Sequence, residues 1–266
     1  MGIIYKNPAL VEVVAELQWN LTPVSGPLGA AVDPFFDILR ADLTPRLAAL
    51  GYGHVMDLVP PQLPREIMAW KPLCRYAASE NAWPKLQLGP GLFSVNMSGV
   101  QYTGWPNFRR TIEDGVGALI ASFPSPERLL HFKSVQLRYI DAFTQAHNYR
   151  SNAQFALDYL GLDNVLPDRF IDKLRLDPAQ ITTASNTRFT LPALESSSAN
   201  IVVSDAKVNG SDSCLVQFNI ETAKAFQPRV GSVMEWLESA HVVAKDMFLS
   251  LASDELQNIM LPEEKK

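Results

Sequence analysis

Chemistry in this chain would have to come from a few polar side chains in the second half of the sequence. Arg138 and Asp141 share a predicted strand. His147 follows six residues after Asp141, and His241 lies on the last predicted helix. A catalytic dyad needs a base within hydrogen-bond reach of a nucleophile, and no nucleophile is marked here, so these four residues are weak catalytic candidates. The alternative is a solvated turn in which Asp141 caps the turn and Arg138 neutralises its charge.

Motifs for metals and cofactors are absent from the sequence. The histidines have no second histidine, cysteine or acid at the spacings of a zinc site. The chain also lacks the glycine-rich phosphate loops and the nucleophile elbow of hydrolases. Gly89-Pro90-Gly91 is a dense glycine feature, but its proline removes an N–H that a phosphate cradle would use. We predict a hairpin turn there, and we expect neither a metal nor a cofactor.

Aromatic residues gather at one corner of the predicted fold. Tyr102, Trp105 and Phe108 lie where a strand gives way to a helix. Such a cluster can line a ligand pocket, or it can plug the end of a sheet. Trp236 lies on the last predicted helix, where it could belong to a partner-binding surface or pack in the core. These four residues are the candidate binding residues.

The composition is that of an ordinary globular chain and argues against a broad nucleic-acid surface. The 266 residues include 23 Lys and Arg against 28 Asp and Glu, a net charge of −5. Nucleic-acid binding needs clustered cations, and no basic run is present. The N-terminal sequence lacks the basic and apolar regions of a secretory leader, and no apolar window of about 18 residues predicts a membrane span. We therefore expect a cytoplasmic protein without a membrane partner, with Cys74 and Cys214 as buried thiols.

Strand and helix periodicities predict an α+β fold with mainly antiparallel sheet and helices on one face. Glu12 and Glu16 alternate with apolar residues in the first strand, where they would protect a sheet edge. Asn209-Gly210 predicts a tight hairpin turn, and Arg109 and Glu113 an ion pair along a helix. The predicted strands cover 11–19, 67–70, 73–79, 85–88, 92–97, 135–140, 188–191, 201–207 and 215–222, and the predicted helices 34–50, 105–123, 152–160 and 230–251.

The two halves of the chain repeat this order loosely, because in each a few strands are followed by a helix. A boundary near residue 126 would separate an N-terminal α+β half, 1–126, from a C-terminal α+β half, 127–266, which ends in the long helix. The strand at 135–140 could equally join the strands of both halves into one continuous domain.

Five segments resemble a sporadically distributed, uncharacterised prokaryotic protein family of similar length. The opening Lys6-Asn7-Pro8-Ala9-Leu10-Val11-Glu12 is similar to that family's Lys-Asn-Pro-Pro-x-x-Glu start, although Ala9 replaces its second proline. The other segments are the Leu-Gly-Pro-Gly hairpin in 88–96, Tyr102 with the Gly104-Trp105-x-x-Phe108 motif, the strand 137–141, and the Ala240-His241 helix with Phe248. The resemblance implies no established activity. Its patchy distribution suits exchanged bacterial genes, including those of toxin–antitoxin or phage-defence systems.

Three hypotheses about function follow from the sequence. The first is a non-enzymatic protein-binding or adaptor protein, which offers an apolar or edge-strand surface to a protein partner or to a second copy of itself. The second is an RNA-binding protein with ferredoxin-like units, in which Lys6, Arg75, Lys85, Arg109 and Arg110 would serve. The third is an enzyme with an unrecognised His/Asp/Arg site. We favour the first because strands and aromatic residues abound without a convergent catalytic set, and because the fold order is analogous to that of chaperone-like sheets.

Overall fold

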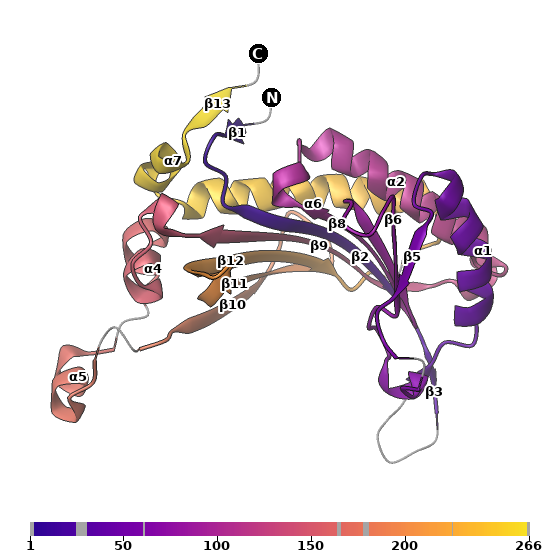
Figure 1. Ribbon diagram of the computed structural model, residues 1–266, viewed down its shortest axis with the longest axis horizontal. Helices are drawn as coiled ribbons and strands as arrows, with labels where there is room; N and C mark the ends of the chain where they lie inside the picture. The colour runs from indigo at the N-terminus through magenta and orange to yellow at the C-terminus, as the bar shows by residue number, and fades with distance from the viewer. Residues whose placement is uncertain are drawn as a thin grey trace.

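A nine-stranded antiparallel sheet runs through the computed structural model, which describes residues 3–24, 31–60, 62–163, 166–177, 181–224 and 226–264. Its strand order is β10-β11-β12-β9-β2-β8-β7-β6-β5 (Figure 1). The predicted α+β class with mainly antiparallel sheet is therefore confirmed. In chain order its strands are β2 (Leu10–Trp19), β5 (His54–Asp57), β6 (Cys74–Ala77), β7 (Lys85–Gly89), β8 (Leu92–Ser98), β9 (Phe132–Phe143), β10 (Ala184–Thr190), β11 (Ser197–Val208) and β12 (Ser211–Thr222).

Shorter strands and helices surround this sheet. Two small sheets pair β1 (Ile3–Tyr5) with β13 (Pro262–Glu264) and β3 (Thr22–Pro23) with β4 (Ala31–Val32). The α-helices are α1 (Phe36–Ala49), α2 (Trp105–Ser122), α3 (Pro126–Leu129), α4 (Asn152–Leu160), α5 (Asp168–Leu174), α6 (Val230–Leu251) and α7 (Asp254–Met260). Single 3₁₀ turns are η1 (Arg65–Ile67), η2 (Gly99–Gln101) and η3 (Gln145–His147).

The two halves of the chain meet in the middle of the sheet. β2 from the first half pairs with β9 from the second, and β9 also pairs with β12. Each half orders its elements alike along the chain: a central strand, a helix, further strands and a closing helix. The closing helices, α2 and α6, lie next to each other over the sheet (Figure 1).

In the described part of the chain, helices cover one face of the sheet and leave the other face open. The inward side chains of β2, such as Val13, Ala15 and Leu17, are fully buried beneath the helices. α1 contributes Leu39 and Leu43 to the same core. The remaining helical contacts come from α2, α4 and α6, whose apolar faces follow the predicted three- and four-residue spacing. The sheet arches so that its open face is on the inside of the curve (Figure 1).

Several predicted elements agree closely with the structure. The helices at 152–160 and 230–251 are α4 and α6, and the helix predicted at 105–123 ends one residue earlier as α2. Asn209 and Gly210, at φ 51° and 82°, form the two-residue turn between β11 and β12. Cys74 and Cys214 are buried free thiols, as predicted.

Other expectations are wrong. β2 is the central strand of nine, so Glu12 and Glu16 do not protect a sheet edge but point to the open face. The segment 67–70 is no strand, because η1 occupies its start and Trp70 takes a left-handed φ of 53°. The solvated turn expected at Asp141 is instead buried strand β9, with Arg138 on the opposite face.

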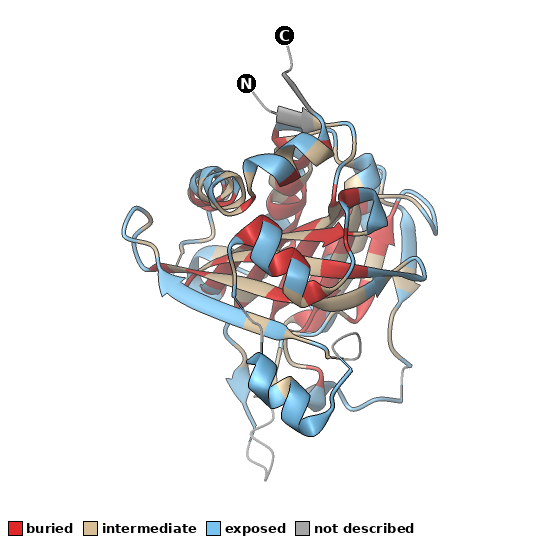
Figure 2. Cartoon of the chain, turned by 90° about the vertical axis from the view of Figure 1, so that its left-hand side faces the viewer, coloured by how far each residue is buried: buried red, intermediate tan, exposed pale blue. Residues whose placement is uncertain are grey.

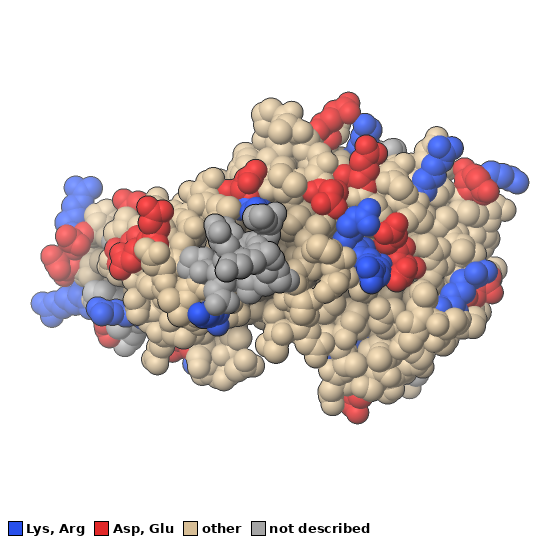
Figure 3. All heavy atoms as spheres, turned by 90° about the horizontal axis from the view of Figure 1, so that it is seen from above, with Lys and Arg blue, Asp and Glu red and all other residues tan. Residues whose placement is uncertain are grey.

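Charges of both signs alternate over the helix-covered side of the molecule. Figure 3 shows lysines and arginines next to aspartates and glutamates, with no large area of one sign. Arg109 and Glu113 form the predicted pair along α2, with an N–O distance of 2.9 Å. Among the helices in the described ranges, none is long and apolar enough to cross a bilayer.

Candidate functional site

The N-terminal turn of α2 packs against the middle of α6 through an aromatic stack. The indole of Trp105 lies parallel to the imidazole of His241, with ring centroids 4.4 Å apart and an interplanar angle of 7°. The Trp105 Nε1–H donates to Glu238 Oε2 at 2.8 Å. Glu238 is three residues before His241, so one face of α6 holds both the ring and the carboxylate that Trp105 contacts.

A chain of hydroxyl contacts continues from His241 into the sheet. His241 Nδ1 is 2.8 Å from the hydroxyl of Tyr139 on β9, and that hydroxyl is 3.4 Å from the hydroxyl of Tyr102. The ring of Phe108 meets Tyr102 edge-on. Burial lowers the pKa of His241, with Lys245 acting in the same direction and Glu238 opposing it. Burial also holds the pKa of Tyr139 well above its usual value. A neutral imidazole therefore meets a neutral phenol at neutral pH.

Charged side chains close the outer side of this cluster. Arg109 Nε lies 3.2 Å from Glu238 Oε2, the oxygen that also accepts from Trp105. Arg109 also pairs with Glu113 on its own helix. Arg110, its neighbour in sequence, is exposed on the surface of α2.

The geometry is that of a packed joint between two helices and a strand. Trp105 is 7% exposed and Phe108 is 1% exposed, so the aromatic corner fills the joint instead of lining an open pocket. His241 could exchange a proton with Tyr139, but no serine or cysteine of the described residues donates a hydrogen bond to its ring. A base without a nucleophile gives no catalytic dyad.

The other candidate residues lie apart from this joint. Trp236 is buried one turn before it on α6, and its Nε1–H donates to Ser197 Oγ at 3.2 Å. Arg138 points to the open face of the sheet, where it donates to Gln136. His147 is buried in η3 and is 3.3 Å from the Asn7 carbonyl, so it ties the N-terminal segment to the end of β9.

Asp141 is a buried carboxylate two residues beyond Tyr139. Strand alternation places both side chains on the helix-covered face of β9. No hydrogen bond or ion pair from the described residues reaches the Asp141 carboxylate, and burial raises its pKa to about 7. The four weak catalytic candidates therefore do not converge: only His241 belongs to the joint, and Asp141 does not contact it.

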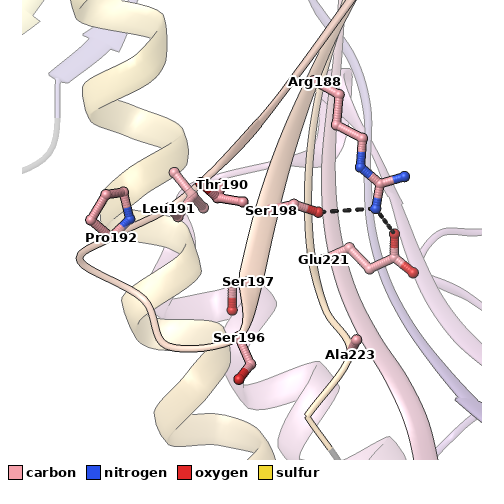
Figure 4. Close-up of a pocket in the computed structure, with 9 residues that line it drawn as sticks. All are labelled: Arg188, Thr190, Leu191, Pro192, Ser196, Ser197, Ser198, Glu221 and Ala223. Carbon is pink, nitrogen blue, oxygen red and sulfur yellow. Dashed lines mark hydrogen bonds and ion pairs between the residues drawn. The ribbon is translucent and has the colours of Figure 1, made fainter.

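The structure contains a shallow hollow that the sequence did not predict. It has a volume of about 320 Å³ and lies at the end of β10, beside the loop that leads to β11. Figure 4 shows Arg188, Ser198 and Glu221 converging at its upper side. Within the described ranges, no three histidine, cysteine or acidic side chains gather as a metal site would require.

Sequence reasoning also missed an exposed arm between α4 and β10. Its helix α5 carries Phe170 and Leu174, four residues apart, and Leu166 lies two residues before the helix begins. The four-residue spacing of the apolar side chains could have predicted this helix, but the segment is short and charged residues stand between them.

Comparison of the chain with protein-family models, with curated proteins and with solved structures gave no match.

Proposed function

We propose that this chain is a non-enzymatic protein-binding protein that docks α5 into an apolar groove of a protein partner. One observation supports this proposal above all: α5 exposes its apolar side chains. Phe170 is 47% exposed and Leu174 is 54% exposed. Leu166 and Leu176, which flank the helix, are exposed as well.

A short, exposed helix such as α5 is not expected to be stable without a partner to pack against. Seven residues make an isolated helix marginal in water, so α5 needs packing to stabilise it. Every described residue from 166 to 177 is exposed except Ile171, which is half-buried. Figure 2 shows α5 as an almost wholly exposed helix, and Figure 1 shows it set apart from the sheet. Exposed apolar side chains on an amphipathic helix are the usual anchors for a groove on another protein.

The arm leaves α4 at Gly161 and returns to the fold at Thr183. At its start, Gly161 ends α4 with a φ of 64°, a left-handed conformation that glycine adopts without strain. At its end, Asn152 donates to the backbone carbonyl of Thr183 at 2.8 Å, and the Thr183 N–H donates to Asp205 Oδ2 at 3.0 Å. Asp205 is held in turn by the Tyr149 hydroxyl at 3.0 Å. These contacts hold Thr183, at the C-terminal end of the arm, against α4 and β11.

An exposed edge strand lies at the same end of the molecule. β10 forms one end of the sheet, and most of its side chains are exposed. Its free backbone edge could pair with an extended segment of the partner beside the docked helix. We therefore propose β10 as the edge strand of the surface that the sequence suggested in general terms.

The decisive variant is the double substitution Phe170→Ser and Leu174→Ser. Fully burying each side chain would contribute about 1.5–3 kcal/mol, and since about half of each is already buried, the two together would contribute about 1.5–3 kcal/mol, or roughly 10- to 150-fold in affinity. We expect the tagged wild-type chain to retain a partner in fixed stoichiometry when it is purified from its host. The double variant should lose that partner and keep its urea unfolding midpoint.

Ile38→Ser is the matched control, because Ile38 is a 55% exposed apolar residue on α1, at the other end of the sheet. The control should retain the partner. Equal retention by all three proteins would contradict the proposed role of α5. A retained partner that proves to be a second copy of this chain would replace the heterologous partner with self-association.

A further inference from the structure

Charged side chains surround α5 in an arrangement that is sorted by sign. At about 100° per residue, Arg169 and Lys173 lie about 100° and 60° from Phe170, both on the same side of it. Asp168 and Asp172 lie about 160° from Phe170, on the back of the helix. Arg169 and Lys173 therefore line one border of the apolar side of α5, and we call these two residues the cationic edge.

This arrangement does not stabilise an isolated helix. Arg169 and Lys173 are four residues apart, as are Asp168 and Asp172, and like charges at this spacing repel each other on a helix. Arg169 and Asp172 are three residues apart, a spacing that permits an ion pair, yet they form none. All four residues are exposed, and none pairs with an opposite charge of the described residues. The cationic edge is therefore free to meet negative charge outside the chain.

Docking of α5 would bring the cationic edge against a wall of the partner's groove. Phe170 and Leu174 enter the groove in the proposed function, and the cationic edge borders the area that they bury. Basic side chains at such a border lose part of their hydration when the groove closes over their apolar neighbours. Carboxylates on that wall would replace the lost interactions with charge-assisted hydrogen bonds, whereas a neutral wall would not.

We propose that the groove that receives α5 is bordered by carboxylates along the wall that faces Arg169 and Lys173. This inference rests on the proposed docking of α5 and adds the chemistry of the partner. The carboxylates would also fix the direction in which the helix lies. Two apolar side chains one turn apart fit a groove in either direction, but only one direction places the cationic edge against the acidic wall.

A protein groove suits the surroundings of α5 better than an anionic lipid surface does. Membranes also attract helices that combine apolar and basic side chains. The exposed edge strand β10, however, lies at the same end of the molecule, and its backbone groups pair with another polypeptide and not with lipid. The two cations and two aspartates of α5 also cancel, so the helix as a whole carries no charge that would draw it to such a membrane.

Charge reversal on each side of α5 tests the proposal. The probe is the protein that the tagged wild-type chain retains on purification from its host. Arg169→Glu with Lys173→Glu should weaken its binding at least about tenfold, because the former cationic edge would repel the acidic wall. Asp168→Lys with Asp172→Lys is the matched control, since it reverses as many charges on the back of α5, and it should not weaken binding. Both variants should keep the wild-type urea unfolding midpoint, because all four residues are exposed.

A carbodiimide cross-link locates the contact. This reagent joins an amine to a carboxylate that touches it, so it should link Lys173 Nζ to an aspartate or glutamate of the retained protein. Mass spectrometry of the digested complex identifies the linked residues. Lys173→Arg keeps the positive charge but lacks the reactive amine, so this variant should retain the partner and lose that cross-link.

The proposal is overturned if both charge-reversed variants bind equally, or if Lys173 forms no cross-link with the retained protein. Neither result would affect the docking of α5, as long as the variant with Phe170→Ser and Leu174→Ser loses the partner. A wild-type chain that retains no protein overturns both proposals. Co-sedimentation of the wild-type chain with phosphatidylserine vesicles, lost on reversal of the cationic edge, would replace the acidic groove with an anionic membrane.

Discussion

Asp141→Asn should make this protein more stable at pH 8 and much less so at pH 5. The Asp141 carboxyl is buried without a hydrogen bond or ion pair from the described residues, and burial raises its pKa from 3.8 to about 7. A folded-state pKa above the unfolded value means that the native state binds the proton more tightly. Protonation of Asp141 therefore stabilises the folded protein, and this stabilisation is fully present below pH 3.8 and is lost as the pH rises towards 7.

The size of the effect follows from that shift. At about 1.4 kcal/mol per pH unit, titration of Asp141 lowers the free energy of unfolding, relative to its value at low pH, by about 2 kcal/mol at pH 5 and by about 4 kcal/mol at pH 8. At pH 5 the folded protein still holds the proton that the unfolded chain has lost, whereas at pH 8 the buried carboxylate is charged. The amide that replaces the carboxyl cannot ionise, so the stability difference between the variant and the wild type should grow by about 2–3 kcal/mol between these pH values. Other titrating groups are the same in both proteins and cancel.

Urea unfolding followed by tryptophan fluorescence measures this difference at each pH. Asp246→Asn is the control, because Asp246 is exposed on α6, and its effect should stay within about 0.5 kcal/mol at both pH values. A difference for Asp141→Asn that does not change between pH 5 and pH 8 would refute the reasoning. It would show that the carboxylate is solvated or paired in the folded protein.

Two further substitutions test the packing. His241→Ala should destabilise the fold by about 2–4 kcal/mol in urea unfolding, because it removes the aromatic stack and the contact to the hydroxyl of the half-buried Tyr139. Val242→Ala, at an exposed neighbour, should cost less than about 1 kcal/mol. A loss equal to the control would mean that the joint contributes nothing to stability. Gly99→Ala should lower the melting temperature or prevent folding, because an added Cβ would lie 1.7 Å from the Leu10 carbonyl oxygen, and an unchanged melting temperature would show that the two segments are not in this contact.

The sequence was sufficient to predict the elements whose side chains carry a local pattern. Phe155, Ala156 and Tyr159 mark α4 by their helical spacing, and α6 continues such a stripe from Val233 to Ala244. Turn residues fixed the hairpins, since Gly91 takes a φ of 73° that most residues disfavour. These signals depend only on neighbours within a few positions.

The sequence does not predict which distant strands pair with each other. β2 and β9 lie more than a hundred residues apart, and no residue pattern in either strand predicts that it lies at the centre of the sheet. The edge position predicted for Glu12 and Glu16 was wrong for this reason. Both are polar because they face the open side, and alternation alone does not distinguish an open central strand from an edge.

The sequence likewise predicted only part of the candidate site. Tyr102, Trp105 and Phe108 are close in sequence, and their clustering followed from helical and turn geometry. Their meeting with His241 depends on how α6 crosses α2, which no local spacing reveals.

Native mass spectrometry of the untagged protein, purified gently from its host with and without nuclease, tests most directly the claim that this chain is a protein-binding protein. We predict that the wild-type chain carries a discrete protein partner whose mass is unchanged by nuclease. The chain with Phe170→Ser and Leu174→Ser should appear without that partner. A bare wild-type monomer, or a partner retained equally by the double variant, would contradict the account.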